Sequence, residues 1–84
     1  MKKVELFYLK NCPYCKQAIS WMNELKADPK YADIQIKMIE ESEESVYADA
    51  HDYYYVPTFF IDDVKVHEGA ATKEQIEEVL NKSL

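Results

Sequence analysis

Glycine, proline and arginine are scarce in this sequence, which has one glycine, three prolines and no arginine. Because glycine and proline mark turns, each of them carries positional information. The formal net charge is −6, and all ten basic residues are lysines. This balance opposes binding to nucleic acids or to anionic membrane surfaces. No apolar run approaches the roughly 20 residues that cross a bilayer, so no membrane segment is expected.

The remaining composition is that of a small globular protein. The 84 residues predict one domain, residues 1–84, and 48% of them are hydrophobic, which is enough for a packed core. The residues after Met1 lead directly into a strand-like run and lack the small-residue cleavage site of a signal peptide. We therefore expect a cytoplasmic location, where a cysteine pair is more often catalytic than structural.

Both cysteines lie in one tetrapeptide, Cys12-Pro13-Tyr14-Cys15. It follows an apolar run over residues 4–9 and opens a helical pattern over residues 13–27. At such a strand-to-helix junction the motif indicates redox chemistry. The sequence has no second cysteine pair that could complete a four-thiolate metal site.

The spacing assigns different roles to the two thiols. On a first helical turn both sulfurs lie on the same side and can bond. Cys12 occupies the N-cap position, where backbone N–H groups and the helix dipole favour its thiolate, which is the nucleophilic form. Cys15 is expected to be more shielded and fits the resolving thiol, while Pro13 fits the first helical position. The alternatives are a buried reduced pair and an inert structural disulfide.

Hydrophobic patterns and turn residues predict seven elements in the order strand, helix, strand, helix, strand, strand, helix. The strands span residues 3–9, 34–39, 56–61 and 64–66. The first and last helices span residues 13–27 and 73–82, and the second helix begins within residues 40–44 and ends at residue 53. The first two strands form a βαβ unit and should be parallel, and the last two form an antiparallel hairpin. A capping box from Thr72 to Gln75 starts the last helix, and Ser42 is expected to cap the second.

Several charged and aromatic residues have more than one interpretation in this pattern. Glu5 interrupts the first strand and is expected near its exposed start. Lys10 either adds positive potential near the cysteines or is a solvated surface lysine. His51 and His67 have no partner that the sequence can place beside them, so both are expected at the surface or at the end of an element. The tyrosines at 53–55 either line a groove near the cysteines or close the edge of the core.

With C-P-Y-C at the first strand-to-helix turn and Val56-Pro57-Thr58 opening the third strand, the chain resembles the glutaredoxins and small glutaredoxin-like thioredoxins over nearly its whole length. The resemblance implies an α/β, thioredoxin-like fold, β-α-β-α-β-β-α, with a four-stranded mixed sheet and helices on both faces. It implies that Cys12 attacks and Cys15 resolves. It also implies that Pro57 is the cis-proline facing the disulfide and that Val56 offers its backbone to an extended substrate. The substrate-binding residues expected on these grounds are Lys10, Pro13, Tyr14, Val56, Pro57 and Gly69.

Departures from the family pattern bear on glutathione. Leu9 stands where glutathione-using glutaredoxins usually carry a basic residue, and Lys10 is one position later. The stretch Glu68-Gly69-Ala70-Ala71-Thr72 keeps the second glycine of the family's Gly-Gly pair and lacks the aspartate that follows in the family. Without these charges, glutathione should be held weakly. The dipeptide before Cys12 also lacks the tryptophan of ordinary thioredoxins.

These features predict a glutaredoxin-like thiol–disulfide oxidoreductase that reduces protein or low-molecular-weight disulfides through Cys12 and Cys15, with roles in electron transport and cell redox homeostasis. The resemblance implies glutathione or a thioredoxin-reductase-type flavoprotein as the reductant. We expect no bound cofactor, no metal, no nucleic-acid or membrane partner, and a monomer. One alternative is a binding module whose CxxC thiolates hold a metal or an iron–sulfur cluster. The other is a non-catalytic interaction domain of the same fold.

Overall fold

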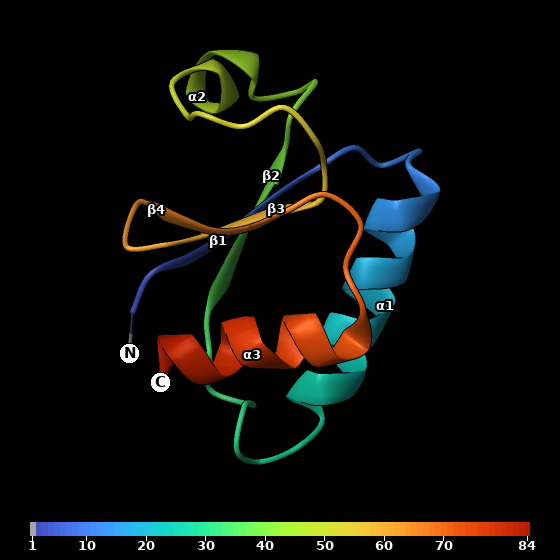
Figure 1. The fold of residues 1–84 in the computed structure, drawn as a ribbon, viewed down its shortest axis with the longest axis vertical. Helices are drawn as coiled ribbons and strands as arrows, with labels where there is room; N and C mark the ends of the chain where they lie inside the picture. The colour runs from blue at the N-terminus through green and yellow to red at the C-terminus, as the bar shows by residue number, and fades with distance from the viewer. Residues whose placement is uncertain (1) are drawn as a thin grey trace.

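The computed structural model describes residues 2–84 (Figure 1). Its elements in chain order are β1 (Val4–Tyr8), α1 (Pro13–Lys26), β2 (Ile36–Glu40), α2 (Ser45–Asp49), β3 (Thr58–Ile61), β4 (Val64–Glu68) and α3 (Lys73–Ser83). The predicted order of strands and helices is confirmed. Within residues 2–84, no helix is both long and apolar enough to cross a membrane.

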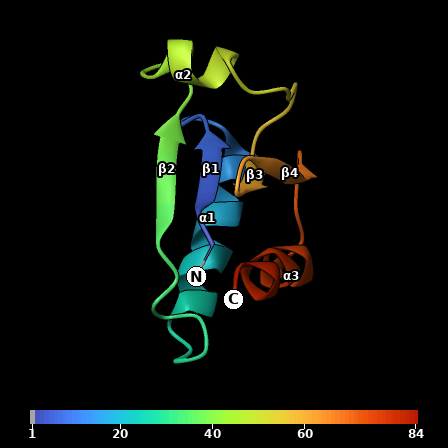
Figure 2. The same cartoon turned by 90° about the vertical axis from the view of Figure 1, so that its left-hand side faces the viewer.

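The four strands form one mixed sheet in the order β2-β1-β3-β4. β1 pairs in parallel with β2 and antiparallel with β3, and β3 and β4 form the predicted antiparallel hairpin. Asp62 and Asp63 form its turn with φ values of 49° and 67°, as a two-residue hairpin turn requires. Figures 1 and 2 show α1 and α3 on one face of the sheet and α2 on the other. The thioredoxin-like α/β architecture with helices on both faces is therefore confirmed.

The larger hydrophobic core lies between the sheet and the helices α1 and α3. Successive side chains of a strand point to opposite faces, so Val4 and Leu6 of β1 both face this core. Three residues of α1, Ala18, Met22 and Leu25, are buried in this core, and Ile19 is partly buried against it. The core contains Val4, Leu6, Ala18, Met22, Leu25, Tyr31, Ile34, Phe59, Ile61, Ile76, Val79 and Leu80.

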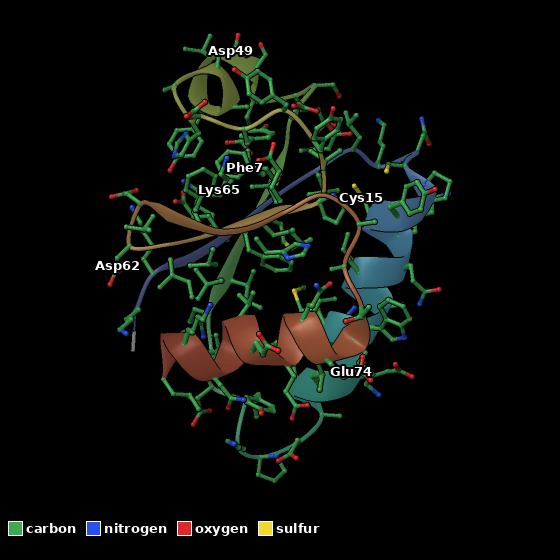
Figure 3. The ribbon with its side chains drawn as sticks, in the orientation of Figure 1. Phe7, Cys15, Asp49, Asp62, Lys65 and Glu74 are labelled. Atoms are coloured by element: carbon green, nitrogen blue, oxygen red, sulfur yellow. The ribbon has the colours of Figure 1, made fainter. Side chains whose placement is uncertain are left out.

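A smaller aromatic core lies under α2. Figure 3 labels Phe7 on this side of the sheet. Phe7 is fully buried, and its ring centroid lies 5.0 Å from that of Tyr53 and 5.3 Å from that of Phe60. In α2 the buried residue is Ala48. This short helix is therefore attached to the sheet mainly through side chains that surround Phe7.

The prediction for Glu5 is wrong: its side chain is completely buried. β1 is a central strand, so even its first residues are covered on both faces. Glu5 shares the α2 face with Phe7 because the two residues are two positions apart. The hydroxyl of Tyr47 donates a hydrogen bond to its Oε2 atom, and that contact offsets part of the cost of burying the carboxylate.

The start of the second helix also differs from the prediction. α2 begins at Ser45, with Glu44 at the N-cap position. Glu40 instead ends β2, where it is paired with Tyr8. Its carboxylate accepts hydrogen bonds from both the backbone N–H and the hydroxyl of Ser42, at 2.7 and 2.6 Å. Ser42 is thereby held in the turn after β2 and does not cap the helix.

The start of the last helix agrees with the prediction. Thr72 is its N-cap, and the hydroxyl oxygen of Thr72 accepts a hydrogen bond from the backbone N–H of Gln75 at 3.1 Å. The side-chain oxygen of Gln75 accepts one in return from the backbone N–H of Thr72 at 2.9 Å. This reciprocal pair is the capping box that the sequence predicts. The other end of α3 contacts the start of the chain, because the N–H of Lys2 donates to the carbonyl of Ser83 at 3.1 Å.

Candidate active site

The two cysteines lie at the N-terminal end of α1, where Figure 3 labels Cys15. Cys12 is the N-cap residue and Pro13 follows it in the first turn, as predicted. The turn that leads into the helix is closed by the N–H of Cys12, which donates to the carbonyl of Leu9 at 3.1 Å. Both cysteines are reduced; Cys12 is partly exposed and Cys15 is buried. One thiol is thus accessible to a substrate and the other is shielded.

The surroundings move the pKa values of the two thiols in opposite directions. Partial burial raises the pKa of Cys12, but hydrogen bonds from the Cys15 backbone and thiol and from the Tyr14 backbone outweigh it and lower that pKa overall. For Cys15, burial is the largest cause and raises the pKa to about 12. Cys12 is therefore the thiol that ionises more readily, because hydrogen bonds favour its charged form, whereas burial disfavours the charged form of Cys15.

This asymmetry predicts the order in which the thiols are alkylated. We expect Cys12 in the reduced protein to react with iodoacetamide with a midpoint below the free-thiol pKa of about 8.5. Cys15 should stay unmodified through that pH range, because burial raises its pKa to about 12. Peptide mapping by mass spectrometry over a pH series would assign each reaction. A Cys12 midpoint at or above about 8.5 would contradict the assignment of the nucleophile.

The residues before β3 meet the cysteine motif at the same end of the sheet. Thr58 at the start of β3 pairs with Phe7 near the end of β1, and the chain continues from β1 into the cysteine turn. The peptide bond between Val56 and Pro57 is cis, as the resemblance implies. Within residues 2–84, no hydrogen bond engages the backbone N–H or C=O of Val56. These groups are therefore available for pairing with an extended segment.

Gly69 lies against this same segment. Its N–H donates to the carbonyl of Pro57 at 2.8 Å, and its φ of 91° is a conformation that L side chains rarely adopt. A Cβ at this position would also meet the Cβ of Tyr55 at 3.8 Å. The single glycine of the chain is therefore explained by the backbone turn that follows β4.

The three consecutive tyrosines divide between the two interpretations left open by the sequence. Tyr53 belongs to the aromatic core, and its hydroxyl donates to a carboxylate oxygen of Glu41 at 2.9 Å. Tyr54 and Tyr55 have exposed fractions of 84% and 70%. Tyr14, in the cysteine motif, is also exposed, at 65%. The exposed tyrosines provide apolar surface on segments that flank the cysteine end of the sheet.

Glu68 holds the segment that carries the two exposed tyrosines, a role that the sequence pattern did not reveal. Its Oε2 atom accepts hydrogen bonds from the backbone N–H groups of Tyr54 and Tyr55, and its Oε1 atom lies 2.7 Å from the Nζ atom of Lys65. The Lys65 hydrogen bond, followed by those from the tyrosine backbone, lowers the pKa of Glu68 to about 2. In the sequence, only the position of Glu68 beside Gly69 indicated that it has a role near the site.

Replacing Glu68 with glutamine tests this arrangement. Because folding lowers the pKa of Glu68 from 4.5 to about 2, its stabilising effect is complete above pH 4.5 and is lost as the pH falls towards 2. We therefore expect Glu68→Gln to lower the melting temperature at neutral pH and the difference from wild type to shrink near pH 2. Thermal unfolding at both pH values measures this. Glu78→Gln, at an exposed site on α3, should leave the melting temperature unchanged, and an equal loss in that control would contradict the assignment.

An open groove of about 350 Å³ lies beside Cys12 and is lined by Leu9, Lys10, Asn11, Cys12, Glu40 and Ser42. The backbone N–H of Lys10 donates to Oε2 of Glu40 at 3.0 Å. Its Nζ atom lies 3.4 Å from a carboxylate oxygen of Glu43. The predicted basic residue is thus in the groove, but Glu43 already partly neutralises its charge. Glu40 and Ser42 also line the groove, although their positions in the sequence suggested a helix start.

Comparisons with known proteins agree with the fold described above. The family model described as a thioredoxin domain matches residues 2–81. A thioredoxin from Malassezia sympodialis has a TM-score of 0.77 at 18% identity, over 98% of this chain and 74% of that one. An oxidised thioredoxin from Plasmodium falciparum has a TM-score of 0.74 at 17% identity, over 96% of this chain and 79% of that one. A mutant thioredoxin from Halobacterium salinarum has a TM-score of 0.72 at 21% identity, over 98% of this chain and 74% of that one. Among curated proteins, no sequence matches.

Proposed function

The chain belongs to the thioredoxin-domain family, and from that premise we propose that it is a glutaredoxin-like thiol–disulfide oxidoreductase acting on protein or low-molecular-weight disulfides. The observation that carries this proposal is the pair of unequal thiols at the start of α1. Cys12 is partly exposed with a lowered pKa, and Cys15 is buried with a raised one. An attacking thiol must be accessible and ionised, and a resolving thiol must be protected from premature reaction.

In the first step, the Cys12 thiolate attacks one sulfur of the substrate disulfide. A bond forms between the two sulfurs, the substrate S–S bond breaks, and one substrate thiolate leaves. The groove beside Cys12 and the backbone of Val56 are the proposed contacts for the substrate segment that carries the attacked sulfur. Pro13, Tyr14 and Gly69 complete the proposed binding surface, and Pro57, whose side chain is fully buried, holds the cis bond that presents the backbone of Val56.

In the second step, Cys15 loses its proton and attacks the sulfur of Cys12. The mixed disulfide breaks, the second substrate thiol leaves, and Cys12 and Cys15 become joined by a disulfide. The raised pKa of Cys15 opposes the loss of its proton, but once Cys15 is joined to Cys12 the departing thiolate takes up that proton and leaves as a neutral thiol below its own pKa of about 8.5. The substrate gains the two electrons that the dithiol loses.

The reductant that restores the dithiol is proposed to be glutathione or a thioredoxin-reductase-type flavoprotein. The charge of the groove gives glutathione no advantage, because Glu43 pairs with Lys10 and anionic glutathione would meet a carboxylate there. We further propose that the protein acts as a monomer in a reducing compartment such as the cytoplasm, since such a compartment keeps the dithiol available.

The test is to reduce the oxidised protein in two separate assays. One supplies glutathione with glutathione reductase and NADPH, and the other supplies NADPH with a thioredoxin reductase. Turnover with glutathione would identify a glutaredoxin activity, and turnover with the flavoprotein alone would identify a thioredoxin-like electron donor. Failure in both assays, with an intact fold by circular dichroism, would refute the proposed function.

A pair of variants tests the role of Lys10 in the glutathione assay. Glu43→Gln removes the carboxylate that lies 3.4 Å from the Lys10 ammonium, so glutathione should reduce this variant faster than wild type. Glu44→Gln removes a neighbouring negative charge whose side chain makes no capping hydrogen bond, and it should have a smaller effect. Equal rates in the two variants would exclude a specific contact between glutathione and Lys10.

A further inference from the structure

Three metal-ligating side chains meet on the α2 face of the sheet, outside the site described above. They are Glu5 of β1, His51 just after α2 and Asp63 in the turn between β3 and β4, and one potential ligand atom of each lies within 4.8 Å of the others. From the sequence no acidic partner could be placed beside His51, and the structure places Glu5 and Asp63 near it. The three residues lie far apart in the chain, so their spacing gave no signal.

Glu5 provides the strongest indication that the cluster binds something. Its side chain is fully buried, and Oε1 has no hydrogen-bond partner among residues 2–84. The other oxygen, Oε2, accepts the hydrogen bond from Tyr47. A buried carboxylate oxygen without a partner is costly. This one lies in the same cluster as an imidazole and a second carboxylate.

His51 is held in a form suited to metal binding. Its Nδ1 atom lies 2.9 Å from the carbonyl oxygen of Tyr47. A carbonyl only accepts hydrogen bonds, so this contact places the proton on Nδ1 and leaves a lone pair on Nε2. The ring is also packed, with centroid distances of 4.7 Å to Phe7 and 5.1 Å to Phe60. Metal-bound histidines commonly donate their other N–H to such an acceptor.

The group that competes for this site is Lys3. Its Nζ atom lies 2.9 Å from Oδ1 of Asp63 but 3.9 Å from Oε1 of Glu5. The second distance is too long for a hydrogen bond, so Lys3 balances the charge without satisfying the buried oxygen. Its side chain is half exposed. It can therefore turn into solvent when a better cation enters.

We propose that Glu5, His51 and Asp63 form a binding site for a divalent transition-metal ion such as Zn²⁺, with water as a fourth ligand. Zinc accepts imidazole nitrogen and carboxylate oxygen at about 2.0–2.2 Å in tetrahedral geometry. The ligand atoms must move together from their present separations, and the partly exposed side chain of His51 and the exposed side chain of Asp63 allow that movement. The bound ion would join β1, the end of α2 and the β3–β4 turn, and so fasten α2 to the sheet.

The test uses the oxidised protein, because the Cys12–Cys15 disulfide prevents the thiols from binding zinc. Isothermal titration with ZnCl₂ should give one site per chain. His51→Gln removes a direct ligand and should weaken binding by at least about tenfold, which is the lower end of the losses seen when only an outer-shell partner is removed. His67→Gln is the matched control, since His67 lies on β4 with its Nε2 atom 3.0 Å from the carbonyl of Gly69. It should bind zinc as the wild type does.

Two more variants sharpen the result without disturbing buried Glu5. Asp63→Asn preserves a residue type that tolerates the positive φ of this turn, and it should weaken zinc binding. Lys3→Gln removes the competing ammonium and should tighten it. A zinc affinity that is unchanged in His51→Gln, or that falls equally in His67→Gln, would overturn the proposal, as would the absence of saturable binding. None of these outcomes depends on the redox assays.

Discussion

Cys12→Ser is expected to abolish disulfide reduction, with a loss of about a thousandfold or more, as follows removal of a catalytic nucleophile. Cys15→Ser should behave differently. It retains the accessible Cys12 thiol, so it can still complete the first step and form the mixed disulfide. It lacks the buried thiol that releases a protein substrate. We therefore expect a covalent complex with the substrate to accumulate in this variant.

Mass spectrometry and non-reducing gels measure the two outcomes directly. A model protein disulfide mixed with reduced Cys15→Ser should give an adduct that dithiothreitol removes, and Cys12→Ser should give none. In the glutathione assay, Cys15→Ser can remain active, because a second glutathione molecule can resolve a mixed disulfide with glutathione. An adduct formed through Cys15 in Cys12→Ser would reverse the assigned roles of the two cysteines.

Phe7→Ala is expected to cause the largest loss of stability, about 3–5 kcal/mol, which is the usual cost of replacing a buried phenylalanine with alanine. Phe7 is fully buried on the central strand, and its ring contacts the rings of Tyr47, His51, Tyr53 and Phe60. A protein of this size has a total stability of about 5–15 kcal/mol. The substitution should therefore leave a substantial unfolded population and release α2.

Urea denaturation followed by circular dichroism measures this prediction. Phe7→Leu keeps most of the buried apolar volume and should lose much less stability than Phe7→Ala. Val46→Ala is the surface control: Val46 lies in α2 with an exposed fraction of 87%, so its substitution should change stability by less than about 0.5 kcal/mol. A loss below about 1 kcal/mol in Phe7→Ala would show that the aromatic core contributes little.

The parts of the fold that follow local rules were predictable from the sequence. The cysteine turn, the limits of α1 and the capping box at Thr72 depend on neighbouring residues and familiar spacings. The cis bond before Pro57 followed from the family resemblance. In each of these cases the residues that determine the structure are close together in the chain, so a pattern in the sequence records them.

The parts that depend on distant residues were not predictable in this way. The partner of buried Glu5 is Tyr47, which lies 42 positions away in the chain. Ser42 fits a helix cap by type, yet Glu40 holds it in the preceding turn. Likewise, the hydrogen bonds that Glu68 accepts from the backbone of Tyr54 and Tyr55 join the end of β4 to the segment before β3. Polar contacts of this kind have no periodicity, so only the folded arrangement reveals them.

The central position of β1 has a consequence for how the protein is made. Val4 pairs with Ile36 on one side and with Ile61 on the other, and Lys2 bonds to Ser83. During synthesis, β1 can therefore pair with β2 early, but its other edge waits until β3 leaves the ribosome. Contacts between such distant residues form slowly, because a long loop must close first. Until then the apolar edge from Val4 to Tyr8 is open, and it is the segment through which we expect unfinished chains to associate.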